Sequence, residues 1–291
     1  MEGLIISNIS NLYQVKVENK VIECSVRGRI KQTDLSPVVG DNVEIELLDN
    51  EDKGIINDII DRKTYCKRPK IANLSQIILV VSLKNPKPDL LLLDKQLAYS
   101  EYLNIKPIIC INKIDVGDRE VLKKIHSIYE KIGYKVIETA AKENIGVEEI
   151  KKILKGNITA FSGNSGVGKS TLINKLLNRD EAKEGEISVK NKKGKNTTTS
   201  SFLYEIDEGY IADTPGFSTF SIEEIESKDL AHYFIEFTDY ISECEYGDCS
   251  HIKENNCGIK DALNNGKINI ERYENYCKIC EELKDKEERK W

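Results

Sequence analysis

The sequence of 291 residues has no long apolar run, no basic segment at its start and no excess of positive charge. Because no stretch of about 18 apolar residues occurs, a membrane-spanning helix is not expected. The first ten residues contain no basic segment and no small-residue cleavage site, so we expect no secretory signal and a cytoplasmic location. Internal repeats and low-complexity tracts are also missing. With 40% hydrophobic and 32% charged residues, the composition is that of a globular chain rather than a disordered or fibrous one.

The net charge of −6 is distributed unevenly along the chain. Residues 71–222 carry 22 basic and 19 acidic side chains, whereas residues 223–291 carry 10 basic and 18 acidic ones. Bulk charge therefore gives no support for nucleic-acid binding, and any such contact must use local patches. We expect neither DNA nor a membrane as a partner.

The length predicts two or three domains, and the pattern of residues suggests where they lie. Residues 1–70 are predicted to be all-β, because short β-branched segments alternate with turn-forming residues. Five strands of this length suit a small closed barrel such as an OB-fold, although another small β-scaffold remains open. The expected strands cover residues 3–9, 12–19, 21–28, 41–48 and 54–60.

A basic cluster follows the predicted barrel, and Arg68-Pro69 fits a domain boundary there. The cluster could contact phosphates or form a solvated linker. Its members are Arg62, Lys63, Lys67, Arg68 and Lys70.

Residues 71–222 alternate between buried strands and amphipathic helices, which predicts an α/β domain with a parallel sheet. Strands are expected at 75–82, 106–112, 134–139 and 157–163, with helices at 90–103, 118–133 and 147–154. After residue 222 this alternation stops. Residues 223–291 are acidic, cysteine-rich and mostly helical in spacing.

Residues 163–170, GNSGVGKS, match the phosphate-loop pattern G-x-x-x-x-G-K-[ST] between a predicted strand and a predicted helix. Glycines let backbone N–H groups close around phosphates, and the helix N-terminus adds partial positive charge. Lys169 is expected to reach the β- and γ-phosphates, and the Ser170 hydroxyl is expected to bind Mg²⁺. The motif alone does not distinguish ATP from GTP.

Two further motifs favour a guanine base. Asp115 in the sequence Asn112-Lys113-Ile114-Asp115 follows a buried strand, where open α/β sheets bind ligands. Its carboxylate can accept two hydrogen bonds from guanine, a pair that adenine does not offer. The sequence Thr139-Ala140-Ala141-Lys142 is similar to the Ser-Ala-Lys loop that GTPases place behind the guanine.

Two threonine- and glycine-containing segments are expected to sense the γ-phosphate. In the sequence Asp213-Thr214-Pro215-Gly216, Asp213 can hold Mg²⁺ through water, and the Gly216 N–H can face the γ-phosphate. Among the threonines at 197–199 we favour Thr198 as the Mg²⁺-binding switch residue, with Thr199 second.

The candidate site residues form two sets. The expected catalytic residues are Lys169, Thr198, Asp213 and Gly216, with Ser170, Thr198 and Asp213 as Mg²⁺ ligands. The expected nucleotide-binding residues are Asn112, Lys113, Asp115, Ala140, Ala141, Gly163, Asn164, Ser165, Gly166, Val167, Gly168, Lys169, Ser170 and Thr171.

The base-reading motifs precede the phosphate loop, which reverses the usual GTPase order and indicates a circular permutation. A doubly wound sheet tolerates this because domain termini often lie close together. The chain therefore runs from Asp213 and Gly216 directly into the acidic C-terminal region, which makes that region a natural reporter of nucleotide state.

Five of the eight cysteines lie after residue 243. Cys244, Cys249, His251 and Cys257 offer three thiolates and one imidazole, a set that suits tetrahedral Zn²⁺. A rival ligand set would use the C-x-x-C pair Cys277 and Cys280, and unliganded buried cysteines are the third alternative.

Taken together, the motif order, the β-rich N-terminus and the C-x₄-C-x-H-x₅-C cluster resemble the RsgA (YjeQ) family of circularly permuted GTPases. The resemblance covers nearly the whole chain. It implies an OB-fold at 1–70, a permuted GTPase domain at 71–222 and a zinc domain at 223–291, with Cys244, Cys249, His251 and Cys257 as ligands of one Zn²⁺. It also implies binding of GTP and GDP with Mg²⁺, contact with the 30S ribosomal subunit and 16S rRNA, late subunit assembly, and GTP hydrolysis that the subunit stimulates. A monomer is expected.

The sequence departs from related enzymes at two places. Lys195-Asn196 stands where many family members have Arg-His, and Phe217 stands where Ras-like enzymes have a water-orienting glutamine. We assign no catalytic role to either. Two alternative functions remain open: a P-loop kinase or ATPase acting on a small molecule, and an RNA-binding assembly factor that uses nucleotide without meaningful hydrolysis.

Overall fold

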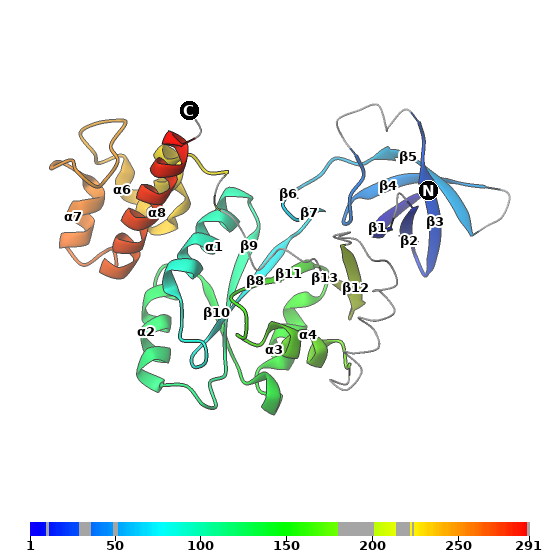
Figure 1. Cartoon of the computed structure of the whole chain (residues 1–291), viewed down its shortest axis with the longest axis horizontal. Helices are drawn as coiled ribbons and strands as arrows, with labels where there is room; N and C mark the ends of the chain where they lie inside the picture. The colour runs from blue at the N-terminus through cyan, green and yellow to red at the C-terminus, as the bar shows by residue number, and fades with distance from the viewer. Residues whose placement is uncertain are drawn as a thin grey trace.

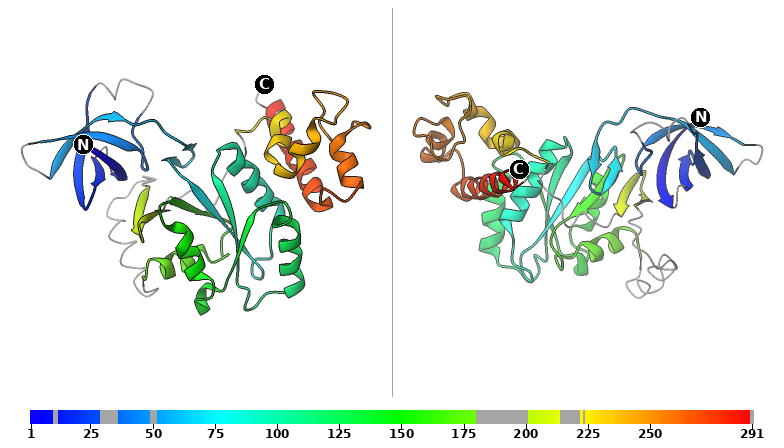
Figure 2. Two further views of the ribbon diagram at one scale, coloured as in Figure 1. Left: turned by 180° about the vertical axis from the view of Figure 1, so that it is seen from behind. Right: turned by 45° about the horizontal axis from the view of Figure 1, so that its top comes forward.

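A computed structural model describes residues 1–9, 12–28, 36–48, 52–179, 201–213, 222 and 224–289. In this part of the chain a β-barrel, a central α/β domain and a C-terminal helical region follow one another (Figure 1). Figure 2 shows from two further directions that the α/β domain lies between the other two. No helix in the described ranges is both long enough and apolar enough to cross a membrane.

The N-terminal barrel closes because its first strand pairs with both β2 and β4. The strand order is β1-β2-β3-β5-β4, with β3 and β5 parallel. This confirms the five-stranded barrel that the alternating pattern predicted. Its strands are β1 (Glu2–Ile9), β2 (Leu12–Val17), β3 (Lys20–Val26), β4 (Asn42–Leu47) and β5 (Lys53–Ile59).

The basic cluster after the barrel is not an open linker. Three of its residues, Lys67, Arg68 and Lys70, belong to a two-stranded hairpin of β6 (Tyr65–Lys67) and β7 (Lys70–Ala72), in which Cys66 and Ile71 are fully buried. Arg62 donates to the buried carboxylate of Asp41 at 2.7 and 2.9 Å, so this guanidinium is not available for phosphates.

The central sheet has the order β10-β9-β8-β11-β13-β12. All neighbouring pairs are parallel except β12 with β13. The predicted strands and helices are present, and β12 is a strand that the sequence pattern did not predict. The strands are β8 (Gln76–Ser82), β9 (Lys106–Asn112), β10 (Lys135–Thr139), β11 (Ile158–Ser162), β12 (Phe202–Ile206) and β13 (Gly209–Asp213).

Helices cover both faces of this sheet, because alternate residues of the buried strands point in opposite directions. Ile77 and Leu79 of β8 pack toward α1 and α2, whereas Ile78 and Val80 pack toward α3 and α4. The helices are α1 (Leu90–Tyr102), α2 (Arg119–Tyr129), α3 (Val147–Leu154) and α4 (Lys169–Leu176), and a short 3-10 helix η2 (Ala141–Glu143) follows β10.

The C-terminal region packs on α1 and shares a hydrophobic core with it. Its longest helix has Asn269 as its N-cap, whose side chain accepts from the backbone N–H groups of Glu271 and Arg272. The elements are η5 (Ser227–Tyr233), η6 (Ile235–Phe237), α6 (Thr238–Ile241), α7 (Gly258–Asn264) and α8 (Ile270–Glu288).

Candidate nucleotide site and metal centre

The predicted motifs meet at one edge of the central sheet. Because β8, β9, β10 and β11 are parallel, their carboxyl ends lie together. Asn112 pairs in register with Ser82 on one side and with Thr139 on the other. From β8 the chain adds β9 and β10 on one side of the sheet, and it then returns to place β11 on the other side of β8. The phosphate loop follows β11 and therefore starts at this topological switch point.

Two glycines show why the phosphate loop between β11 and α4 needs its sequence. Gly163 has φ +139°, and a Cβ atom there would lie 2.3 Å from the Val80 carbonyl oxygen. Gly168 has φ +103°, and its Cβ would lie 2.2 Å from Asn112 Nδ2. Both positions therefore exclude a side chain on two grounds, backbone conformation and space.

Lys169 lies at the start of α4 and folds against the loop. Its Nζ donates to the carbonyl oxygens of Gly163 at 2.7 Å and Asn164 at 2.9 Å. Burial lowers the pKa of this ammonium group. The next residue, Ser170, is exposed to the cavity beside the loop.

Asn112 joins three loops through a buried side-chain amide. Its Nδ2 donates to the Val167 carbonyl of the phosphate loop at 2.9 Å. Its Oδ1 accepts from Thr139 Oγ1 and from the Ala141 backbone N–H, both at 3.1 Å. The Asn-Lys-x-Asp and Thr-Ala-Ala-Lys segments are thus fixed to the phosphate loop, and Asn112 acts as structural support.

Lys113 fixes a further loop. Its Nζ donates to the Gly166 carbonyl at 2.7 Å and to the Asn85 carbonyl, and its backbone is left-handed with φ +64°. Asp115, two residues later, stays exposed at the cavity. The residues of this motif therefore have different roles. Asn112 and Lys113 hold neighbouring loops together, and Asp115 is exposed at the cavity, where it can contact a ligand.

One cavity of about 590 Å³ joins the phosphate loop to the Asn-Lys-x-Asp motif. Lys84, Asn85 and Val116 also line it, and no motif marks these three residues. Their positions shortly after the ends of β8 and β9 could have identified them, because ligands bind at the carboxyl ends of parallel strands. The predicted residues that line it are Asn112, Lys113, Asp115, Ala141, Ser165, Gly166, Gly168, Lys169, Ser170 and Thr171.

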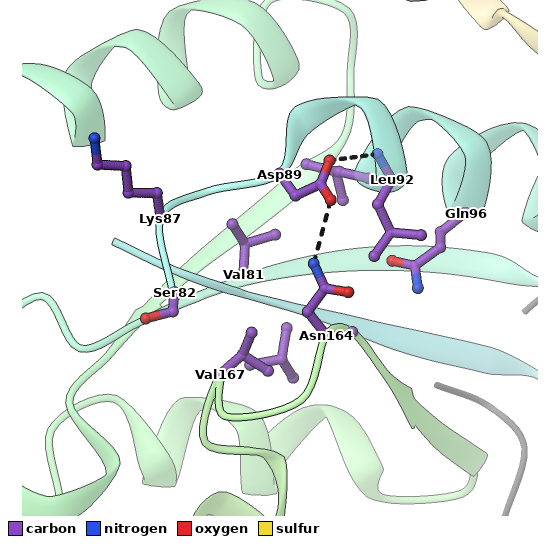
Figure 3. Close-up of a pocket in the computed structure, with 11 residues that line it drawn as sticks. Val81, Ser82, Lys87, Asp89, Leu92, Gln96, Asn164 and Val167 are labelled. Carbon is purple, nitrogen blue, oxygen red and sulfur yellow. Dashed lines mark hydrogen bonds between the residues drawn. The ribbon is translucent and has the colours of Figure 1, made fainter. Parts of the chain in front are cut away.

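The remaining predicted nucleotide-binding residues lie beside this cavity rather than on its wall. Gly163, Asn164 and Val167 line a small adjacent space of about 10 Å³ between the phosphate loop and α1 (Figure 3). Ala140 is buried and hydrogen-bonds with Ile145 through its backbone.

The oxygen atoms available near the loop fit Mg²⁺. Asp213 ends β13, which runs parallel to β11 with Ala212 opposite Ala160, so its exposed carboxylate lies at the same sheet edge as the phosphate loop. Carboxylate and hydroxyl oxygens are hard ligands of the kind that Mg²⁺ prefers. Thr198, Thr199, Gly216, Phe217 and the Lys195-Asn196 pair lie outside the described residues.

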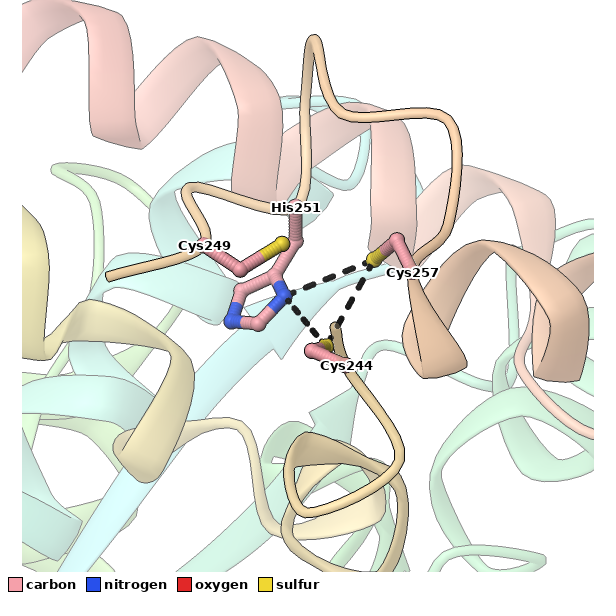
Figure 4. Close-up of side chains that lie close together, drawn as sticks. All are labelled: Cys244, Cys249, His251 and Cys257. Carbon is pink, nitrogen blue, oxygen red and sulfur yellow. Dashed lines mark hydrogen bonds between the residues drawn. The ribbon is translucent and has the colours of Figure 1, made fainter. Parts of the chain in front are cut away.

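The second site brings Cys244, Cys249, His251 and Cys257 together (Figure 4), with their ligand atoms all within 4.8 Å of one another. His251 Nδ1 lies 3.4 Å from Cys244 Sγ and 3.5 Å from Cys257 Sγ, and these two sulfurs are 3.9 Å apart. A zinc tetrahedron with ordinary Zn–S and Zn–N bonds has edges of roughly 3.5–3.8 Å. The four side chains therefore fit one Zn²⁺, with His251 presenting Nδ1.

The protonation chemistry of these residues also suits a metal ion. Burial lowers the pKa of His251, which favours the neutral imidazole that binds metals. Burial raises the pKa values of Cys249 and Cys257, so these thiols need a cation beside them to ionise.

A set of hydrogen bonds orients the loop of residues 244–257, which carries the four candidate Zn²⁺ ligands. The Tyr276 hydroxyl donates to the Ser250 carbonyl at 2.9 Å, and the Tyr273 hydroxyl donates to the His251 carbonyl at 2.8 Å. Glu254 accepts from the backbone N–H groups of Ser250 and Ile252 at 3.1 and 3.2 Å. The loop is thus held both to α8 and to itself.

The rival ligands Cys277 and Cys280 are not part of this group within the described residues. Both lie on α8, and Cys280 Sγ donates to the Ser227 carbonyl at 3.8 Å. Burial raises the pKa values of both thiols.

Comparison with known proteins agrees with this architecture. A profile of the RsgA N-terminal domain matches residues 2–56, and a profile of the RsgA GTPase matches residues 59–223. The chain is 43% identical over 293 residues to the "Small ribosomal subunit biogenesis GTPase RsgA" of Clostridium botulinum strain Hall, and 44% identical over 292 residues to the protein of that name in Clostridium beijerinckii. Each comparison covers 100% of both chains.

Two solved structures share the whole fold. YjeQ from Thermotoga maritima superimposes with a TM-score of 0.84 at 37% identity, covering 97% of this chain and 98% of that one. YloQ, described as a circularly permuted GTPase, superimposes with a TM-score of 0.83 at 31% identity, covering 98% and 95%. The permutation that the motif order predicted is therefore confirmed, and the chain belongs to the RsgA family of GTPases.

Proposed function

We propose that this GTPase binds the 30S ribosomal subunit, assists its late assembly, and hydrolyses GTP to GDP and phosphate when the subunit stimulates it. The observation that carries the nucleotide part is that Asp115, Lys169 and Ser170 line the same cavity. The ribosomal part is supported by the name of the relatives that match over their full length.

In this proposal Asp115 accepts hydrogen bonds from the ring N–H and the exocyclic amine of guanine. Asn112 and Lys113 keep the loop that carries Asp115 fixed to the phosphate loop, so the distance between base and phosphate pockets is set before the nucleotide binds. Ala141 forms part of the wall behind the base, where its N–H donates to Asn112 Oδ1, and Ala140 lies buried beside it.

At the phosphate end, Lys169 turns from the loop carbonyls to the β- and γ-phosphates. The backbone N–H groups of residues 163–171 surround these phosphates. Ser170, Thr198 and Asp213 would hold Mg²⁺, and the Gly216 N–H would face the γ-phosphate. A bound Mg²⁺ neutralises the charge that develops on the phosphates during hydrolysis.

The chain itself supplies no glutamine after its Asp-x-x-Gly segment, because that position is Phe217. Phenylalanine cannot orient the attacking water, so the intrinsic rate should be slow. The 30S subunit then supplies the missing group or orders the loop, and activating partners of related enzymes accelerate hydrolysis by ~10³–10⁵.

The remaining parts follow the same proposal. The protein acts in the cytoplasm as a monomer, contacts 16S rRNA, and holds one Zn²⁺ on Cys244, Cys249, His251 and Cys257. The three domains are 1–70, 71–222 and 223–291. Five lysines near the switch threonines would contact rRNA phosphates: Lys183, Lys190, Lys192, Lys193 and Lys195, all outside the described residues.

Phosphate release from GTP, measured with and without purified 30S subunits, tests the proposal. We expect slow release alone and strong stimulation by 30S, with no stimulated release from ATP. A Lys169→Ala variant with the same 30S preparation controls for contaminating nucleotidases, and it should show no stimulation.

The possible failures separate the parts of the proposal. Unchanged slow release with 30S would overturn the ribosomal role and direct attention to Asn196 or a missing factor. Equal turnover of ATP would overturn the assignment of Asp115 as the guanine reader and favour the kinase or ATPase alternative.

A further inference from the structure

Helix α1 begins at the phosphate loop. Its N-cap residue, Asp89, uses one carboxylate oxygen to accept from the Leu92 backbone N–H at 3.0 Å. The other oxygen accepts from Asn164 Nδ2, in the phosphate loop, at 3.3 Å. Figure 3 shows both bonds from the one side chain. The start of α1 and the second residue of the loop are therefore held together.

A buried hydrogen bond joins α1 to the base of the same loop. Gln96 Nε2 donates to Ser162 Oγ at 2.8 Å, and these side chains are 2% and 0% exposed. Ser162 is the last residue of β11 and directly precedes Gly163. Because the bond is shielded from water, it constrains the position of the loop more than a surface contact would.

The opposite side of α1 holds the C-terminal region. Asp94 lies two positions before Gln96, which places the two side chains on opposite faces of a helix. The buried Asp94 carboxylate accepts from Arg272 at 2.7 Å, from Asn275 at 2.7 Å and from the Tyr129 hydroxyl at 2.8 Å. One helix thus contacts the phosphate loop with one face and the C-terminal region with the other.

Arg272 carries this connection further into the C-terminal region. Its Nε and second terminal nitrogen donate to the two carboxylate oxygens of Glu236 at 2.7 and 2.9 Å, and its guanidinium lies 4.4 Å from the centre of the Phe234 ring. Burial alone would lower the pKa of Arg272, but the two carboxylates raise it well above its usual value, so the side chain stays charged.

We propose that Arg272 is a positioning residue for nucleotide binding, acting through Asp94 and α1 on the phosphate loop. This inference rests on the proposed guanine-nucleotide site. Lys169 must leave the Gly163 and Asn164 carbonyls when it turns to a phosphate, so the loop carbonyls and the Asn164–Asp89 bond readjust. Helix α1 transmits this change in the phosphate loop to the Asp94–Arg272 pair. Conversely, an intact Asp94–Arg272 pair holds α1 in place and so favours one arrangement of the phosphate loop.

The affinity of the full-length protein for a fluorescent GDP analogue tests the connection from both ends. Gln96→Met removes the bond to the loop with little change in volume, and Arg272→Lys keeps the charge but cannot bond Asp94 and Glu236 in the same way. We expect each variant to weaken GDP binding by roughly 3–10-fold, within the range of known long-range couplings. GDP is chosen because it fills the phosphate loop without a γ-phosphate, so the switch segments are not engaged.

Lys95→Met is the matched control. Lys95 lies between Asp94 and Gln96 and also reaches α8, through a 2.5 Å pair with Glu282, but that pair is in contact with solvent, with exposed fractions of 21% and 46%. Exposed pairs contribute little, so this variant should stay within about twofold of the wild type.

Two readouts separate positioning from simple destabilisation. In the double variant Gln96→Met/Arg272→Lys, we expect no more than the larger single loss, because both substitutions interrupt one connection. Adding GDP should also slow hydrogen exchange in α8 of the wild type but not of Gln96→Met. If Arg272→Lys fails to fold by circular dichroism, the exchange measurement on Gln96→Met decides alone.

Multiplied losses in the double variant, or an α8 response that survives in Gln96→Met, would overturn the inference. Failure of the wild type to bind GDP would instead contradict the proposed function, so the two failures are distinguishable.

Discussion

At the scale of single residues, Gly168 shows how the phosphate loop depends on an absent side chain. Replacing it with alanine would force a left-handed backbone on a residue with a Cβ, and the Cβ would collide with Asn112 Nδ2. Asn112 would then lose its bond to the Val167 carbonyl and release the loop. We predict at least a tenfold loss of GDP affinity for Gly168→Ala, measured by fluorescence titration.

Gly133 provides the control, because it has the same φ of +103° but nothing within 4 Å of its Cβ position. Gly133→Ala should cost about 1–2 kcal/mol of folding free energy from backbone strain and leave GDP affinity unchanged. Equal affinities for the two variants would show that the contact with Asn112 is not what excludes a side chain at Gly168.

Asp115→Asn should change which base the protein binds. Asparagine offers one acceptor and one donor where the carboxylate offers two acceptors, and this pattern suits xanthine better than guanine. We predict weaker GTP binding and stronger binding of xanthosine triphosphate, measured by competition against a fluorescent nucleotide. Asp118→Asn is the control, since Asp118 caps α2 through the Glu120 N–H and asparagine caps a helix equally well. A variant that kept its preference for GTP would remove Asp115 from the guanine site.

The site residues that could be predicted from the sequence belong to motifs whose residues lie close together along the chain. The phosphate loop and the Asn-Lys-x-Asp motif each lie within eight residues, so their patterns are visible without a structure. Other roles depend on partners that folding brings together. The Asn85 carbonyl that accepts from Lys113 is 28 positions away, and Arg272 is 178 positions from Asp94. No local pattern marks such pairs.

At the scale of elements, the loop of residues 244–257 between α6 and α7, which carries the candidate Zn²⁺ ligands, depends on Glu254. This carboxylate accepts from Ser250 and Ile252, the residues on either side of His251, which itself has a left-handed backbone with φ +61°. Glu254→Gln keeps one acceptor and replaces the other with a donor, so part of this network is lost. We predict a lower zinc affinity by about tenfold, as for other outer-shell partners.

Competition with a chromophoric chelator measures this loss. Glu281→Gln is the control, because it makes the same change at an exposed position on α8. Equal zinc retention in both variants would mean that Tyr273 and Tyr276 are sufficient to orient the loop.

Elements with a full hydrophobic pattern were predicted, and short ones were not. β8 is buried along its whole length and is visible as an apolar run. The β6–β7 hairpin has only three residues in each strand. The basic residues around Cys66 and Ile71 leave no apolar pattern in the sequence, although these two side chains are buried. β12 gains its position from pairing with β13 and with the barrel strand β1, contacts that lie outside its own five residues.

At the scale of the whole molecule, the central domain contacts both of its neighbours. The barrel reaches it through the Ser7–Phe202 pairing and a 2.7 Å ion pair between Lys16 and Glu205. The acidic C-terminal region reaches it through the pairs Lys95–Glu282 and Lys124–Glu271 as well as the Asp94–Arg272 bond. The lysine–glutamate pairs place basic side chains of the central domain against acidic ones of the C-terminal region, whereas the buried Asp94–Arg272 pair has the opposite polarity.

The permuted order gives the last prediction. Because the chain passes from Asp213 through the Asp-x-x-Gly segment directly into the C-terminal region, binding of a γ-phosphate should change the dynamics of residues 224–289. We predict different hydrogen-exchange protection there between complexes with a non-hydrolysable GTP analogue and with GDP. Glu224 should be central to the change, since it accepts from the Tyr99 hydroxyl of α1 at 2.9 Å and pairs with Lys67 of the β6–β7 hairpin at 3.3 Å.

The matching ATP analogue serves as the control and should leave the exchange pattern unchanged. Glu224→Gln should reduce the difference between the GTP-analogue and GDP complexes, because a neutral amide holds Tyr99 and Lys67 less strongly than a carboxylate does. Identical protection of residues 224–289 in the two wild-type complexes would mean that the C-terminal region does not report the γ-phosphate. The permutation would then serve only to connect the domains, and any sensing of the nucleotide would depend on the phosphate loop and α1.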